Sequence, residues 1–194
     1  MSFRRLILST ILCCGTACAM AQLRLPVYVD YSEPVTMRSV YRCYTDRSKL
    51  FANISKVNKT LYVYERRATG TVLVAAYPVC LAANYGNKQR RGDHRTPECQ
   101  YGIPFYITEI LDSSKWMHDF GDGRGKILAY GNWFMRLAGD FQWTDIGIHG
   151  SSSNHLTVPG RDSEGCIRLR DDDIIHFHDN YAFVGMEVFI NADN

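Results

Sequence analysis

The stretch from residue 59 to residue 82 constrains the fold most, because its pattern is typical of a β-hairpin. Residues 59–67 are rich in β-branched and aromatic side chains, Ala68-Thr69-Gly70 is a turn signal, and residues 71–82 form a second apolar run. Similar patterns predict further strands at residues 104–111, 144–150, 164–170 and 186–192. Strands therefore dominate the predicted fold.

Helices are expected to be few and short. Asp171, Asp172 and Asp173 precede residues 174–181 and favour a helix there, because negative charge is stabilising at the positive end of a helix. Residues 47–56 and 113–120 are the other candidates for a short helix. The sequence predicts a mainly-β domain with one or two short helices.

The N-terminus resembles a secretory signal. Arg4 and Arg5 precede an apolar run, and Ala19-Met20-Ala21 supplies small residues at the spacing that signal peptidase requires. We expect cleavage before Gln22, with an uncleaved anchor as the alternative. No later segment reaches 18 uninterrupted apolar residues, so no transmembrane span is expected after signal cleavage. The predicted organisation is a signal peptide at 1–21, an N-terminal extension packed on the domain at 22–58, and the main domain at 59–194.

Charge argues against a nucleic-acid binder. The full chain has 22 basic and 20 acidic residues. Loss of Arg4 and Arg5 with the signal leaves 20 of each, and a chain without net positive charge lacks the field that attracts phosphates.

Four cysteines remain after signal cleavage: Cys43, Cys80, Cys99 and Cys166. An exported chain enters an oxidising compartment, where disulfides persist, and four cysteines allow three full pairings. Cys166 therefore has several interpretations. It is half of a disulfide, a buried thiol, a zinc ligand with His149 and His155, or a nucleophile, and the spacing of the three residues fits no common zinc pattern.

The nucleophile interpretation depends on two neighbouring motifs. An apolar strand brings His149 to a glycine turn, and twelve residues separate Gly150 from Ser163, which begins Ser-Glu-Gly-Cys. A loop of that length returns to the same sheet edge, so His149 and Cys166 can meet. A free thiol is mostly protonated at neutral pH, and a neighbouring imidazole activates it by taking the proton. The amides of Gly165 and Cys166 could then face a developing oxyanion.

These residues resemble the signature of the L,D-transpeptidase catalytic domain family. The matching pattern is IHG, twelve residues, and then SEGCIRL. The stretch KQRRGDHRTPEC followed by PFYI, and the tail GMEVFI, also resemble family motifs. The similarity spans residues 59–190. It implies a β-sandwich-like L,D-transpeptidase catalytic domain.

The resemblance implies a role for each matching residue. Cys166 is the nucleophile that forms a thioester, His149 is its base, and the Gly150 carbonyl orients His149. Gly165 supplies an oxyanion-hole amide and Ser163 supports the cysteine turn. Arg168 braces the site, meets a substrate carboxylate or forms a structural salt bridge. No metal or organic cofactor is implied.

The sequence departs from the family pattern at two positions. Glu164 stands where the family often has a second histidine, and a carboxylate beside a thiolate opposes its formation. It is the second expected substrate-binding residue, after Arg168. Cys99 stands where a glycine is usual, and a disulfide from Cys99 to Cys80 or Cys43 is expected to hold that loop.

The implied substrates are peptidoglycan stem peptides, and the implied location is the periplasm or cell envelope of a bacterium. Cys166 would attack the third residue of a tetrapeptide stem and release D-alanine. An amine of another stem, or of a wall-anchored protein, would accept the acyl group. Two alternatives remain open: a carboxypeptidase or crosslink hydrolase that uses water, and a silent secreted binding module with Cys166 in a disulfide. The family also implies sensitivity to carbapenems.

Overall fold

The computed structural model describes residues 46–139 and 145–193. The strands are β1 (Leu50–Ser55), β2 (Thr60–Arg67), β3 (Gly70–Pro78), β4 (Cys80–Ala82), β5 (Phe105–Asp112), β6 (Met117–Asp119), β7 (Lys126–Leu128), β8 (Trp133–Ala138), β9 (Gly147–His149), β10 (Gly160–Ser163), β11 (Ile167–Arg168) and β12 (Glu187–Ile190). The helical segments are α2 (Asp171–Asn180) and the 3₁₀ turns η2 (Arg47–Lys49) and η3 (His155–Thr157). The mainly-β prediction is confirmed. The predicted signal peptide lies outside the described residues.

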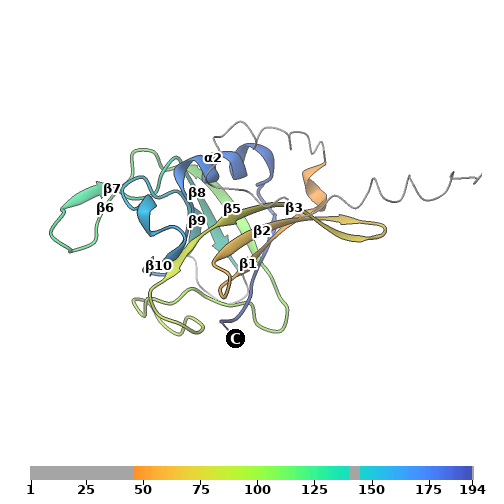
Figure 1. Ribbon diagram of the computed structural model, residues 1–194, viewed down its shortest axis with the longest axis horizontal. Helices are drawn as coiled ribbons and strands as arrows, with labels where there is room; N and C mark the ends of the chain where they lie inside the picture. The colour runs from red at the N-terminus through yellow and green to blue at the C-terminus, as the bar shows by residue number, and fades with distance from the viewer. Residues whose placement is uncertain (1–45, 140–144, 194) are drawn as a thin grey trace, which may run out of the picture.

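Ten strands form one mixed sheet, in the order β10-β4-β11-β9-β8-β5-β12-β1-β2-β3. The predicted hairpin of β2 and β3 is one end of this sheet, and Thr60 pairs with Pro78 in it. The sheet twists strongly, so that β5 and β8 cross the direction of β1 to β3 (Figure 1). Strands β6 and β7 pair with each other and project from the body as a separate hairpin (Figure 1).

Strand β1 corrects two predictions. Residues 50–55 form no helix, because Leu50, Ala52 and Ile54 alternate with outward residues and lie in the core. This strand pairs with β12 on one side and with β2 on the other. The main domain therefore begins before residue 59, and the predicted boundary after residue 58 falls inside the sheet.

The core lies on one face of the curved sheet, and α2 packs on it. Ile174 and Phe177 of α2 are fully buried there, beside Tyr77 of β3. Helix α2 confirms the prediction made from its three leading acids. No helix in residues 46–139 and 145–193 is long and apolar enough to cross a membrane.

The predicted helix at residues 113–120 is wrong. Met117 pairs with Leu128 across the β6–β7 hairpin, and the turn contains residues 121–125, which are three glycines alternating with the exposed Asp122 and Arg124. Trp116 packs edge-on against Tyr130 with ring centroids 5.8 Å apart, and this contact holds the base of the hairpin. Aromatic packing across the hairpin therefore overrides the local helix signal.

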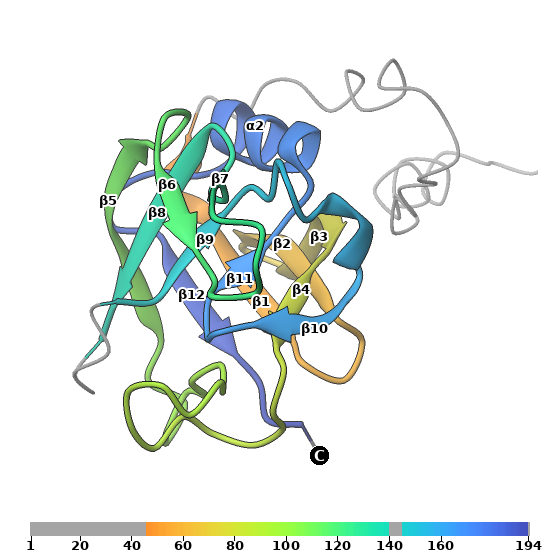
Figure 2. The ribbon, with the colours of Figure 1, turned by 90° about the vertical axis from the view of Figure 1, so that its left-hand side faces the viewer.

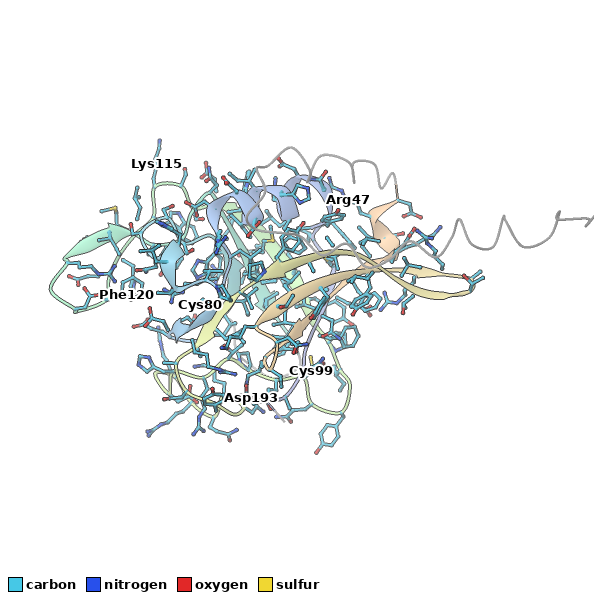
Figure 3. The ribbon with its side chains drawn as sticks, in the orientation of Figure 1. Arg47, Cys80, Cys99, Lys115, Phe120 and Asp193 are labelled. Atoms are coloured by element: carbon cyan, nitrogen blue, oxygen red, sulfur yellow. The ribbon has the colours of Figure 1, made fainter. Side chains whose placement is uncertain are left out.

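The described cysteines are not cross-linked. Cys80, Cys99 and Cys166 are all free thiols, so the pairing of Cys99 with Cys80, one of the two expected alternatives, is absent. Cys80 is fully buried, whereas Cys99 lies beside β12 and accepts a hydrogen bond from the Ile190 amide. Figure 3 shows Cys80 and Cys99 in different parts of the domain. Cys43 lies outside the described residues.

Candidate active site

Two neighbouring parallel strands bring Cys166 and His149 together. In the pairing of β9 with β11, Ile167 lies opposite Ile148, and Arg168 lies opposite His149. Both isoleucines are fully buried in the core. Because strand side chains alternate between faces, Cys166, His149 and Arg168 project from the opposite face of the sheet.

A pocket of about 470 Å³ opens on that face. Three segments line it: the basic loop with Arg91, Gly92 and His94; the β6–β7 hairpin and β8 with Trp116, His118, Phe120, Ala129, Tyr130, Phe134 and Arg136; and the cysteine side with Asp145, Ile146, His149, Ser163, Glu164, Gly165, Cys166 and Arg168. Figure 2 looks onto the hairpin, with β9 and β11 behind it. The pocket therefore lies between the hairpin and the cysteine turn.

His149 is held in one orientation and one tautomer. Its Nδ1–H donates to the Gly150 carbonyl at 2.5 Å, which leaves the Nε2 lone pair available. The ring stacks on Phe134 with centroids 5.5 Å apart, and Tyr130 lies at 4.9 Å. Burial lowers the pKa of His149 to about 3; the Gly150 contact acts in the opposite direction, and the charge of Arg168 adds a smaller lowering. His149 is therefore a neutral, oriented base.

Cys166 is a protonated thiol in the resting site. Burial raises the pKa of its thiol to about 11, although the Gly147 amide and the charges of Lys88 and Arg168 act in the opposite direction. Glu164 raises this pKa, in the direction predicted from the sequence, and its effect is the smallest of these. The resting pair is thus a neutral thiol and a neutral imidazole, so the thiolate forms only during reaction.

Ser163 closes the cysteine turn. Its Oγ donates to the Cys166 carbonyl at 2.6 Å and accepts from the Gly165 amide at 3.2 Å. This amide therefore has a partner within the turn of the resting site, and its role in an oxyanion hole stays a prediction. A side chain does not fit at Gly165, because a Cβ there would lie 2.8 Å from Ile146 and 3.3 Å from the Arg95 carbonyl.

Arg168 braces the segments around the site. It is 3% exposed, and its Nη2 lies 3.1 Å from the Cys80 sulfur, 3.3 Å from the Thr157 hydroxyl and 3.2 Å from the Asp162 carboxylate. Of the three roles expected from the sequence, these contacts match the brace and the structural salt bridge.

Asp171, at the first turn of α2, anchors the loop that follows His149. Its carboxylate accepts from the Ser151 amide at 2.9 Å and from the Ser152 hydroxyl at 2.6 Å. The run of three acids predicted a helix start at this residue, but it gave no sign of the contact with the site. The carboxylate fixes the backbone beside the Gly150 carbonyl that orients His149.

The hairpin contributes residues that the sequence analysis did not place in the site. Trp116, His118 and Tyr130 line the pocket, and Nε2 of His118 lies 3.7 Å from the Glu164 carboxylate. The apolar stretches on either side of the glycine-rich turn are the only signal that could have shown this hairpin. His155 lies on η3 and does not line the pocket. The described residues contain no cluster of three metal-ligating side chains.

Solved structures share this fold. One is an L,D-transpeptidase from Mycobacterium smegmatis, with 17% identity and a TM-score of 0.50 over 74% of this chain and 59% of that one. Another is the helical cell shape determining protein Pgp2 from Campylobacter jejuni, with 19% identity and a TM-score of 0.51 over 75% of this chain and 48% of that one. A third is L,D-transpeptidase 3 from Mycobacterium tuberculosis in complex with a faropenem-derived adduct, with 14% identity and a TM-score of 0.51 over 74% of this chain and 60% of that one. The chain therefore matches between about half and three fifths of each structure's length. A comparison with curated proteins by sequence finds no match.

The sequence profile of the L,D-transpeptidase catalytic domain matches residues 49–190. This match covers most of the chain, includes β1, and contains both His149 and Cys166. The chain belongs to the L,D-transpeptidase catalytic domain family, whose members are cysteine-dependent enzymes that act on peptidoglycan.

Proposed function

We propose that this protein transfers the acyl group of a peptidoglycan tetrapeptide stem through a thioester on Cys166. The observation that carries the proposal is the pairing of an oriented, neutral His149 with a thiol on the adjacent strand, in one pocket. Family membership supports the reaction class. The free state of Cys166 argues against the binding module with this residue in a disulfide.

The first half of the reaction follows from the resting protonation states. Nε2 of His149 takes the thiol proton as the sulfur of Cys166 attacks the carbonyl carbon of the third stem residue. The C–S bond forms, the C–N bond to D-alanine breaks, and the proton on His149 passes to the departing amine. A thioester and a neutral imidazole remain.

The second half returns the thiol. An amine of another stem, or of a wall-anchored protein, attacks the thioester carbonyl, a C–N bond forms and the C–S bond breaks. The proton lost by the nitrogen passes through His149 to the sulfur. Water in place of the amine would make the protein a carboxypeptidase or crosslink hydrolase.

A β-lactam tests the first half without a natural substrate. A structure with this fold carries a faropenem-derived adduct, and an activated thiol attacks a strained lactam carbonyl as it attacks a stem carbonyl. Intact-mass spectra of the protein incubated with a carbapenem or faropenem should show one adduct. Cys166→Ala, which keeps Cys80 and Cys99, should show none. An unmodified wild-type protein whose Cys166 is reduced would overturn the proposal.

Substrate turnover tests the base. His149→Ala should slow D-alanine release from a tetrapeptide stem by roughly 10²–10⁴-fold, the usual contribution of a positioned general base. A rate close to that of the wild type would place the base elsewhere.

The proposed location is the cell envelope, reached through cleavage of residues 1–21. The family's action on peptidoglycan supports a site outside the cytoplasm. N-terminal sequencing of the protein from a periplasmic fraction should begin at Gln22. A mature protein that retains Met1 would contradict cleavage.

A further inference from the structure

We propose that Glu164 and His118 form the binding site for the ammonium group of the acyl acceptor. This inference rests on the proposed transferase function and concerns its second half. Glu164 lies two residues before Cys166 on the pocket wall, and His118 faces it from the β6–β7 hairpin.

The two side chains approach each other across the pocket. Nε2 of His118 lies 3.7 Å from Oε2 of Glu164, and the side chains are 32% and 53% exposed. The His118 ring is held edge-on against Phe120, with centroids 4.5 Å apart. Phe120 lies on the hairpin side of the domain (Figure 3). An incoming group can therefore reach both Glu164 and His118 from solvent, at the wall that carries the nucleophile.

Among the charged side chains of the pocket, Glu164 is the carboxylate that can bind a ligand cation without competition from an arginine or lysine. Each arginine of the pocket wall is paired with a carboxylate: Arg91 with Asp145 at 3.6 Å, Arg136 with Glu109 at 2.7 Å, and Arg168 with Asp162 at 3.2 Å. In the described part of the chain no lysine or arginine forms a salt bridge with Glu164, whose partner is His118. A ligand cation at Glu164 thus displaces no arginine or lysine.

The aromatic wall suits the same cation. Trp116, Phe120 and Tyr130 line the pocket, and the faces of aromatic rings attract ammonium groups. Burial raises the pKa of the Tyr130 phenol, and the neighbouring Cys166 and Glu164 raise it further, so this ring stays neutral beside both residues. An ammonium bound at Glu164 therefore lies in the same aromatic pocket as the thioester on Cys166.

The chemistry of transfer requires such a site. The acceptor amine is an ammonium ion in water, and it must lose a proton before it attacks the thioester. His118 takes this proton from the ammonium held by Glu164. The amine nitrogen then attacks the thioester carbonyl, the C–N bond forms, the C–S bond breaks, and the second proton passes through His149 to the sulfur. The proton on His118 returns to water.

The test compares two acceptors for the same acyl-enzyme. A stem peptide ending in a diamino acid carries an ammonium group, whereas hydroxylamine is an uncharged nucleophile at neutral pH. Glu164→Gln should lower kcat/KM for the stem amine by about tenfold, the scale of one charge-assisted hydrogen bond. The value of kcat/KM for hydroxylamine should stay within about twofold of the wild-type value. His118→Ala should show the same selectivity, and Glu164→Asp should restore part of the loss.

Two controls separate this inference from the proposed function. Acylation by a carbapenem, followed by mass spectrometry, should be no slower in Glu164→Gln, which also shows that the variant is folded. Asp179→Asn removes the same charge from a matched pair on α2, where His178 Nδ1 lies 2.8 Å from the carboxylate and the side chains are 25% and 59% exposed. This substitution should leave kcat/KM unchanged for both acceptors.

Three outcomes would overturn the inference: equal losses for both acceptors in Glu164→Gln, no loss for the stem amine, or the same selective loss in Asp179→Asn. A wild-type protein that forms no acyl-enzyme at all would instead overturn the proposed function.

Discussion

At the scale of single residues, the site is governed by the neutral pairing of Cys166 with His149. Burial moves the two pKa values apart, which keeps the thiol protonated and the imidazole uncharged. A thiol in this state is protected from oxidants and alkylating agents, because the thiolate is the reactive form. Reactivity then depends on a substrate that enters the pocket and accepts attack while His149 removes the proton.

Alkylation of Cys166 should therefore rise with pH throughout the neutral range. The pKa of its thiol is about 11, so the thiolate fraction increases roughly tenfold for each pH unit between pH 6 and 9. Iodoacetamide labelling, followed at the Cys166 peptide, measures this rate. A plateau near pH 7 would reveal a stable thiolate–imidazolium pair instead.

His149 also makes folding stability depend on pH. Between about pH 6.5 and pH 3 the unfolded chain binds a proton on this residue that the folded chain does not bind. The free energy of unfolding should thus fall on acidification through this window, by up to about 5 kcal/mol from this residue. Urea titrations of wild type and His149→Gln at several pH values measure the effect. Equal pH dependence in both proteins would contradict it.

The sequence predicted the residues of the site that belong to two short motifs. Cys166, Ser163, His149 and Gly150 lie in two short segments whose strand-end positions follow from local patterns. His118 could not be found this way, because it reaches the pocket on a hairpin that was read as a helix. Contacts between segments far apart in the chain depend on packing that local patterns do not encode.

At the scale of elements, a close backbone crossing holds the site in place. A Cβ on Gly131 would lie 2.6 Å from the Cα of Gly150 and 2.4 Å from the Asp171 carboxylate. The start of β8, the end of β9 and the first turn of α2 thus meet at one point. The Gly150 carbonyl that orients His149 belongs to this crossing.

Gly131→Ala should therefore impair both stability and catalysis. Its φ of +66° is strained for alanine, and the new methyl group collides with the backbone of Gly150. We expect a loss of about 2–4 kcal/mol in unfolding free energy, together with slower acylation by a carbapenem. Gly102→Ala is the matched control, because its φ is +73° and nothing lies within 4 Å of the new Cβ. It should cost about 1 kcal/mol and leave acylation unchanged.

The elements with strong alternation were predicted well. The hairpin of β2 and β3, strand β5 and helix α2 follow apolar patterns or charge signals that tertiary packing reinforces. Strand β1 was missed because its outward face carries Phe51, which stacks on Tyr64 with centroids 5.4 Å apart. An apolar residue on both faces obscures the period of two on which strand prediction depends.

At the scale of the whole molecule, the N-terminal strand and the C-terminus complete the domain together. Lys56, directly after β1, is 1% exposed, and its ammonium lies 2.6 Å from Glu98 and 3.0 Å from Asp193. It also donates to the Gly86 and Thr96 carbonyls. One buried cation thus joins β1, the basic loop beside the pocket and the chain end.

Lys56→Met should consequently destabilise the protein by about 3–5 kcal/mol, because it leaves the partly buried Glu98 carboxylate without its cation and leaves Asp193 with Arg161 alone. Thermal or urea unfolding measures the loss. Lys49→Met is the control, since the ion pair of Lys49 with Asp46 is more than half exposed on both sides and contributes little. Equal stability of the two variants would contradict a central role for Lys56.

Strand β1 should be required for folding, because it lies in the interior of the sheet. A chain starting at Lys59 loses this strand and Lys56, so β12 and β2 each lose a hydrogen-bonded neighbour in the middle of the sheet. The buried side chains of Leu50, Ala52 and Ile54 leave the core at the same time. We expect this chain not to fold cooperatively.

A chain starting at Asp46 keeps β1 and the whole family match, and it should unfold in one transition and be acylated by a carbapenem. Circular dichroism melts and intact-mass spectra distinguish the two. Cooperative unfolding of the chain that starts at Lys59 would mean that the sheet closes without β1.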